Sequence, residues 1–111
     1  MDCIFCKIIN GDIPSKKIYE DEVCYSFLDI NPQAKVHALI VPKAHIASVD
    51  GIDATNSATV AHIFEVIAAV TASKGIDSYR VVSNIGEQAG QTVPHLHFHV
   101  LSGRDMTWPP G

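Results

Sequence analysis

The chain has 111 residues, which suits one compact domain over residues 1–111 and leaves little room for a second. Hydrophobic residues make up 47% of it and charged residues only 18%, so a packed core can form and a disordered chain is excluded. The net charge of -4 argues against a broad surface for polymeric nucleic acid, although backbone N–H groups and hydroxyls can still bind a small anion.

The cysteine content and the N-terminal sequence favour a cytoplasmic protein. Cys3 and Cys6 form a close pair and Cys24 is left over, which fits a reducing compartment better than a disulfide framework. We expect Cys24 to behave as a buried small apolar residue. The N-terminus lacks a basic segment before a long apolar stretch, and no apolar run approaches the roughly 20 residues of a membrane span, so we expect no membrane association.

Hydrophobic periodicity predicts a short helix over 3–10 and one long helix over 54–74, which Gly75 ends. His62 lies away from the apolar stripe of the long helix and is expected to be solvated. That stripe comprises Val60, Ile63, Phe64, Ile67 and Val70. The predicted strands span 17–20, 23–29, 37–41, 79–83 and 96–101. Strands, then one long helix, then strands indicate an α+β fold with a mostly antiparallel sheet of five strands.

Three histidines alternate within five residues, where positions 95–99 read His-Leu-His-Phe-His. Strand side chains alternate between faces, so His95, His97 and His99 are predicted to share one face. The pattern admits a solvated polar face, a metal site made of these histidines alone, or nucleophilic and acid–base chemistry. We favour the last because imidazole is neutral and nucleophilic near pH 7, which suits phosphoryl transfer. The residues predicted to face the core are Leu96, Phe98 and Val100.

A polar loop over 84–92 precedes the histidines. Phosphoryl transfer needs hydrogen-bond donors aimed at the developing charge, and a glycine lets the backbone approach a phosphate closely. An ordinary polar turn is the alternative interpretation. The loop lacks the GxxxxGK[ST] pattern, so ATP handling of that type is excluded. Its candidate phosphate donors are Asn84, Gly90, Gln91 and Thr92.

The spacing of Cys3 and Cys6 allows two thiolates to share one tetrahedral metal ion. Two free thiols and a redox pair are the alternatives. A redox pair usually follows a strand in a thioredoxin-like pattern, which this sequence lacks. The remaining metal ligands would have to come from elsewhere in the chain.

The run from His95 to Val100 matches the His–apolar–His–apolar–His–apolar pattern of the histidine triad family, and the resemblance spans nearly the whole chain. The closing WPPG is similar to that of the histidine triad nucleotide-binding branch, whose members hydrolyse purine nucleoside phosphoramidates. The resemblance implies the HIT-like fold and a homodimer. The other matching segments are IFCKII at 4–9, ED at 20–21, FLDINPQA at 27–34, HALIVPKAH at 37–45 and WPPG at 108–111.

By this resemblance the chain is a hydrolase that converts purine nucleoside 5′-phosphoramidates, or related α-phosphate derivatives, to nucleoside monophosphates through a nucleotidyl-histidine. The family's nucleophile falls on His97 and its phosphate-contacting histidine on His99. Its supporting histidine falls on His37, which could otherwise be an ordinary core histidine. The alternatives are a dinucleoside polyphosphate hydrolase and a nucleotide-binding regulatory module with incidental turnover.

The resemblance also implies binding residues. Asn84 and Thr92 fall on phosphate-binding positions, although the family often has serine where this chain has Thr92. Asp29 falls on the residue that binds the ribose hydroxyls. The apolar slot for the base falls on Ile4, Phe5, Ile8, Phe27 and Ile30. By similarity to zinc-containing relatives, a closed and therefore structural Zn²⁺ site falls on Cys3, Cys6, His45 and His95.

Overall fold

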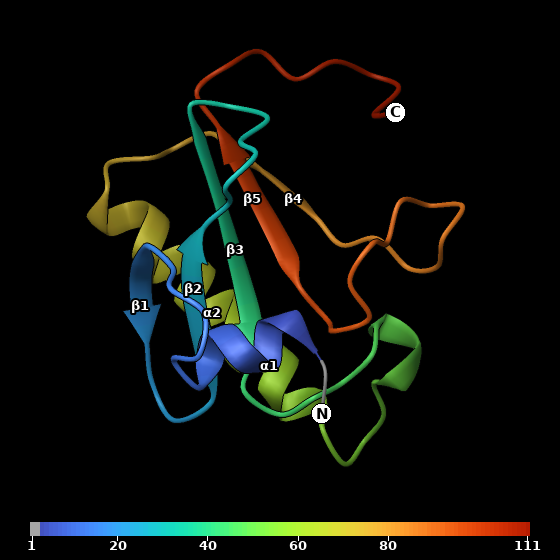
Figure 1. Cartoon of the computed structure of the whole chain (residues 1–111). Coiled ribbons are helices and arrows are strands. Elements are labelled where there is room, and N and C mark those ends of the chain that lie inside the picture. The colour runs from blue at the N-terminus through green and yellow to red at the C-terminus, as the bar shows by residue number, and fades with distance from the viewer. Residues whose placement is uncertain (1–2) are drawn as a thin grey trace.

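A five-stranded sheet forms the centre of the protein, which is described over residues 3–111 by a computed structural model (Figure 1). The strands follow the order β1-β2-β3-β5-β4, and every neighbouring pair is antiparallel. In chain order the elements are α1 (Ile4–Ile9), β1 (Lys17–Glu20), β2 (Cys24–Leu28), β3 (Val36–Pro42), the 3-10 helix η1 (Val49–Gly51), α2 (Ser57–Ser73), β4 (Arg80–Val82) and β5 (Phe98–Ser102). The predicted α+β fold, with a short first helix and one long helix, is confirmed.

The sheet is covered on both faces, by α1 on the near side in Figure 1 and by α2 on the far side. Strand β3 shows why, because Ala38 and Ile40 belong to the core against α2 while Leu39 and Val41 belong to the core against α1. A strand buried on both faces needs an unbroken apolar run, which the sequence ALIV provides. No helix within residues 3–111 is both long and apolar enough to cross a membrane.

Helix α2 begins at Ser57, three residues later than predicted, because short polar side chains bind the backbone just before it. Asp53 Oδ1 accepts hydrogen bonds from the amide and the hydroxyl of Thr55, and Asn56 Oδ1 accepts one from the Asp53 amide. These bonds hold residues 53–56 in a turn. At the other end Gly75, with φ of 70°, takes the left-handed conformation that ends the helix, as predicted.

The buried face of α2 differs from the predicted stripe. Phe64 belongs to the predicted apolar stripe but is 46% exposed, and its ring makes an edge contact with Phe98. Val66 and Thr71 are buried instead. The helix is rotated so that they face the sheet together with Ile63 and Ile67. Thr71 satisfies its hydroxyl by donating to the carbonyl of Ile67, which lets a polar residue occupy this face.

The prediction that His62 is solvated holds only in part: its side chain is 36% exposed, but a contact with Asp21 holds it against the turn between β1 and β2. His62 Nε2 lies 2.5 Å from Asp21 Oδ2, and Tyr19 donates to the same oxygen at 2.8 Å. Asp21 Oδ1 accepts from the amides of Val23 and Cys24. Burial opposes ionisation of Asp21, but the hydrogen bonds from His62 and from these amides outweigh it and hold its pKa well below the usual range. Cys24 is fully buried beside this carboxylate, as predicted.

We expect Asp21→Asn to lower the free energy of unfolding at pH 7 by about 1–3 kcal/mol, because it removes a charged acceptor of several hydrogen bonds. The pKa of Asp21 is lower folded than unfolded, so its ionised form stabilises the fold above about pH 4. That contribution is lost as the pH falls further, so the variant should lose less stability in acid than the parent. Urea unfolding at several pH values measures both effects. Asp77→Asn, at an exposed carboxylate, is the control and should change neither.

Candidate functional site

The histidines of the motif separate into two neighbouring sites. Strand β5 begins at Phe98 and not at position 96, so His99 lies in the strand while His95 and His97 precede it. The rings of His97 and His99 lie with centroids 5.0 Å apart and line one cavity. His95 is fully buried and its ring lies beside the N-terminal cysteines. The predicted core positions Leu96, Phe98 and Val100 are confirmed as buried.

His97 is held through one ring nitrogen, and the other has no hydrogen-bond partner among residues 3–111. Its Nδ1 lies 2.6 Å from the carbonyl oxygen of His95, which can only accept a hydrogen bond. In the neutral ring the proton therefore sits on Nδ1, and Nε2 carries the lone pair. Because the His97 side chain is buried and lines the cavity, this lone pair is the candidate nucleophile.

Hydrogen bonds also fix the ring orientations and tautomers of His37 and His99. The backbone amide of Gln33 can only donate, and it lies 3.1 Å from His37 Nδ1, so the proton of neutral His37 sits on Nε2. His37 Nε2 donates to His99 Nδ1 at 2.8 Å, which places the proton of His99 on its Nε2. His99 thus keeps an N–H that is available for an oxygen in the cavity.

Both of these histidines are neutral near pH 7. Burial lowers the pKa of His37, although the nearby Asp29 carboxylate acts in the opposite direction. Burial, together with the neighbouring His97 and His37, lowers the pKa of His99 to about 4. The pair can therefore donate and accept single hydrogen bonds without adding positive charge to the cavity.

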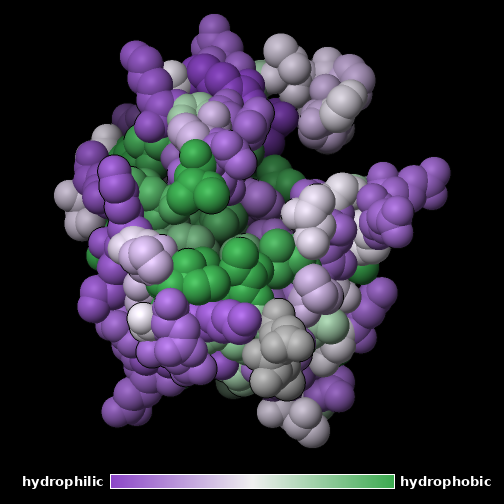
Figure 2. Space-filling model, viewed as in Figure 1, coloured by the Kyte–Doolittle hydropathy of each residue, from purple (hydrophilic) through white to green (hydrophobic). Residues whose placement is uncertain are grey.

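The cavity beside His97 has a volume of about 290 Å³ and is mostly apolar. Figure 2 shows hydrophobic residues gathered around a hollow on the face that carries α1. Asp29 adds a carboxylate to its wall, where one oxygen accepts from the Asn31 amide at 2.8 Å and the other lies 3.4 Å from His37 Nε2. The predicted nucleotide-binding residues that line this cavity are Ile4, Phe5, Ile8, Phe27, Asp29, Ile30, Thr92, His97 and His99.

The polar loop of residues 84–92 contributes to this cavity only in part. Thr92 lines it, whereas Gln91 is engaged within the protein. The Gln91 side chain accepts from the Gly86 amide and donates to the carbonyls of Ala47 and Val93. Gly90 has φ of 96° and passes close to the Asn84 side chain, so a residue with a Cβ would be strained there. In the described chain, Asn84, Gly90 and Gln91 hold the loop beside Thr92, and their phosphate contacts stay predictions.

Four further lining residues were not predicted. Leu39 lies on β3 on the same face as His37, so strand alternation from that histidine could have identified it. The others come from irregular segments and carry no pattern of their own. The unpredicted residues are Ile13, Pro14, Leu39 and Val93.

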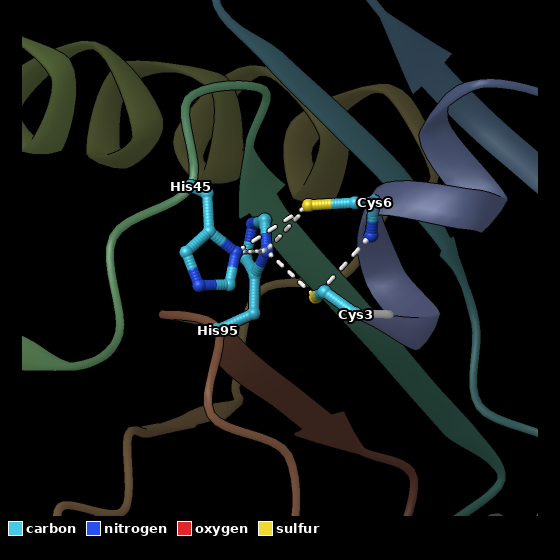
Figure 3. Close-up of side chains that lie close together, drawn as sticks. All are labelled: Cys3, Cys6, His45 and His95. Carbon is cyan, nitrogen blue, oxygen red and sulfur yellow. Dashed lines mark hydrogen bonds between the residues drawn. The ribbon is translucent and has the colours of Figure 1, made fainter. Parts of the chain in front are cut away.

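The second site brings together Cys3, Cys6, His45 and His95 (Figure 3), the four predicted zinc ligands. Their ligand atoms all lie within 4.8 Å of one another. Zinc–nitrogen distances of about 2.0–2.1 Å and zinc–sulfur distances of about 2.3 Å imply tetrahedral edges of roughly 3.3 Å between nitrogens and 3.6 Å between sulfur and nitrogen.

The measured separations match these edges. His45 Nδ1 and His95 Nδ1 are 3.2 Å apart. The sulfur–nitrogen distances are 3.3 Å from Cys3 to His95, 3.4 Å from Cys6 to His45 and 3.6 Å from Cys6 to His95. The residues therefore fit a tetrahedral ion such as Zn²⁺.

The electrostatics of this cluster also suit a cation. His95 Nε2 donates to the Pro42 carbonyl at 2.9 Å, so the Nδ1 that faces the cysteines carries a lone pair. Burial lowers the pKa of His95, and burial together with Cys3 raises the pKa of Cys6, so neither group gains charge easily by itself. A divalent cation among them would favour the thiolate and neutral imidazole forms that bind metals.

Comparison with known proteins identifies the family of the chain. A model described as the HIT domain matches residues 10–106. An uncharacterized HIT-like protein of Synechococcus elongatus is 45% identical, over 99% of this chain and 97% of its own. A HIT family hydrolase from Legionella pneumophila superposes with a TM-score of 0.96 at 42% identity, over 99% of this chain and 100% of that one. A histidine triad nucleotide-binding protein from Candida albicans superposes with a TM-score of 0.87 at 38% identity, over 99% and 85%. The chain belongs to the HIT, or histidine triad, family.

We propose that the four-residue cluster binds structural Zn²⁺. Protein prepared without added metal should contain about one zinc per chain by elemental analysis. The double variant Cys3→Ala/Cys6→Ala should lose the zinc, whereas Cys24→Ala should keep it, because Cys24 lies outside the cluster. Chelation should mainly lower the melting temperature, since a closed site contributes to folding and not to the reaction. Zinc retained by the double variant would contradict the assignment.

Proposed function

We propose that this protein is a hydrolase that cleaves purine nucleoside 5′-phosphoramidates, or related α-phosphate derivatives, to nucleoside monophosphates. One observation carries the proposal. The His95 carbonyl holds His97 with the Nε2 lone pair free, in a cavity that also contains an apolar slot, a carboxylate and the second histidine His99. The names of relatives support it, since the Legionella protein is called a hydrolase and the Candida protein nucleotide-binding.

The chemistry follows from the tautomers of the two rings. His97 Nε2 attacks the α-phosphorus and forms a P–N bond, while the bond from phosphorus to the leaving amine breaks with its electrons. The amine takes a proton from water, and the hydroxide that this leaves is consumed by the proton released when water attacks phosphorus in the next step. Water then attacks the nucleotidyl-histidine, which releases the monophosphate and restores neutral His97. His99 Nε2–H donates to a phosphate oxygen, whose negative charge increases in the transition state.

A neighbouring cavity favours a dinucleoside polyphosphate hydrolase as the second candidate function. It has a volume of about 630 Å³ and shares Asp29 and Ile30 with the first cavity. Lys16 and Lys35 line it, so it offers cationic groups to a larger anionic substrate. Turnover measured side by side on AMP and GMP phosphoramidates, acyl adenylates and dinucleoside polyphosphates separates the two candidates.

We expect His97→Ala to abolish nearly all turnover while nucleoside monophosphate binding persists. A nucleophile contributes to the transition state far more than to ground-state binding. His99→Ala should be less severe, because it removes a phosphate contact and not the attacking atom. A labelled α-phosphate should be trapped on His97 as an acid-labile, base-stable adduct after acid-free denaturation. Substantial activity in His97→Ala, or a label on another residue, would refute this mechanism.

We expect Asp29→Ala to weaken binding of a nucleoside monophosphate by roughly tenfold or more, because a hydrogen bond to a charged acceptor contributes about 1.5–3 kcal/mol. Asp29 also lies beside His37, so a loss of affinity alone does not identify ribose as its partner. Titration calorimetry with the ribonucleotide and with its 2′-deoxy analogue supplies the control. The deoxy analogue should lose less affinity, and equal losses for both sugars would argue against ribose binding.

A further inference from the structure

The turn after β5 reaches back to the loop that precedes β3. Arg104 Nε donates to the carbonyl oxygen of Gln33 at 2.8 Å. The two segments meet closely here, since a Cβ at Gly103 would lie 2.6 Å from the Cβ of Lys35. With φ of 97° as well, position 103 accepts only glycine without a shift of one segment. Arg104 therefore holds the backbone of residue 33 from outside the cavity.

Gln33 connects this contact to the reaction site through its backbone amide, which donates to His37 Nδ1. While that amide faces Nδ1, the nitrogen cannot take up a proton without placing two N–H groups against each other. His37 therefore stays neutral. Its Nε2–H lies 2.8 Å from His99 Nδ1 and 3.4 Å from Asp29 Oδ2, so His99 is the nearer acceptor.

A protonated His37 would change this choice of acceptor. Hydrogen bonds between opposite charges are stronger, so an imidazolium would give its Nε2–H to the Asp29 carboxylate. His99 Nδ1 would then lose its donor, and nothing would keep the His99 proton on Nε2. The other ionisable groups around His37 are His99 on β5 and the lysines Lys16 and Lys35 across the larger cavity.

We propose that Arg104 is a positioning residue: by holding the Gln33 carbonyl it keeps the Gln33 amide on His37 Nδ1, so that neutral His37 gives its Nε2–H to His99 and not to Asp29. The effect on turnover rests on the proposed hydrolysis. The effect on the protonation of His37 does not, and it is measurable without any substrate.

Long-range ¹H–¹⁵N NMR spectra of the full chain test the proposal, because they report the protonation of each ring nitrogen as the pH is varied. In Arg104→Ala, we expect the proton affinity of His37 to rise roughly three- to tenfold, the range set by one hydrogen bond. Arg80→Ala is the matched control, since Arg80 donates to the Thr107 carbonyl of the same C-terminal segment and its loss also removes one positive charge. It should leave His37 unchanged.

Two substitutions at Gln33 separate the hydrogen bond from the charge of Arg104. Gln33→Pro deletes the amide N–H and no charge, so it should raise the proton affinity of His37 at least as much as Arg104→Ala. Gln33→Ala keeps the amide and removes only the side-chain bond to the Asn31 carbonyl, so it should leave His37 as it is. In Arg104→Ala and Gln33→Pro, kcat should fall roughly three- to tenfold on the acid side of the pH profile, with a smaller change in KM, whereas Gln33→Ala should keep the parent profile.

Unchanged His37 protonation in Arg104→Ala and in Gln33→Pro would overturn the proposal, as would an equal change in Arg80→Ala or Gln33→Ala. If the parent protein turns over no nucleotide substrate, the proposed function fails instead. The NMR titration then still decides whether Arg104 controls His37.

Discussion

The antiparallel pairing of β3 with β5 is the constraint on which the rest of the site depends. It sets His37 opposite Leu101 and Leu39 opposite His99, so the two histidines are diagonal neighbours on one face of the sheet. Their 2.8 Å hydrogen bond follows from that register. A slip by one residue would turn every side chain of β5 to the other face, and it would place His99 in the core against α2.

The same pairing lets one short segment serve two sites. Just before β5 the chain leaves the strand, so His95 turns toward the cysteines while His97 lines the cavity. The His95 backbone carbonyl still holds the His97 ring, and the His95 side chain belongs to the candidate metal site. An ion bound there would therefore restrain the peptide whose carbonyl holds His97, the proposed nucleophile, without touching the His97 ring.

Much of the fold was predictable because strong local patterns agree with the tertiary structure. The alternating strands and the long helix emerged from periodicity, and Gly75 ended the helix as expected. The exposure of Phe64 and the contact of His62 with Asp21 were missed, because tertiary contacts set the rotation of a helix and bring together residues 41 positions apart. The contribution of Gln33 has no sequence signal at all. It comes from a backbone amide, which every residue but proline possesses, and only the folded chain shows where that amide points.

Phe5 packs between the cavity beside His97 and the cluster that contains His95. Its ring makes edge contacts with His95, His97 and Phe27, at centroid distances of 5.9, 5.1 and 5.6 Å. One aromatic ring thus forms a side of the cavity that we propose for the base and also packs against a residue of the candidate metal site. Substitutions that widen the cavity should therefore be poorly tolerated at position 5. A smaller side chain there would enlarge the cavity but would also remove packing against His95. New substrate preferences should arise more readily at Ile30, which lines the same cavity but is 92% exposed.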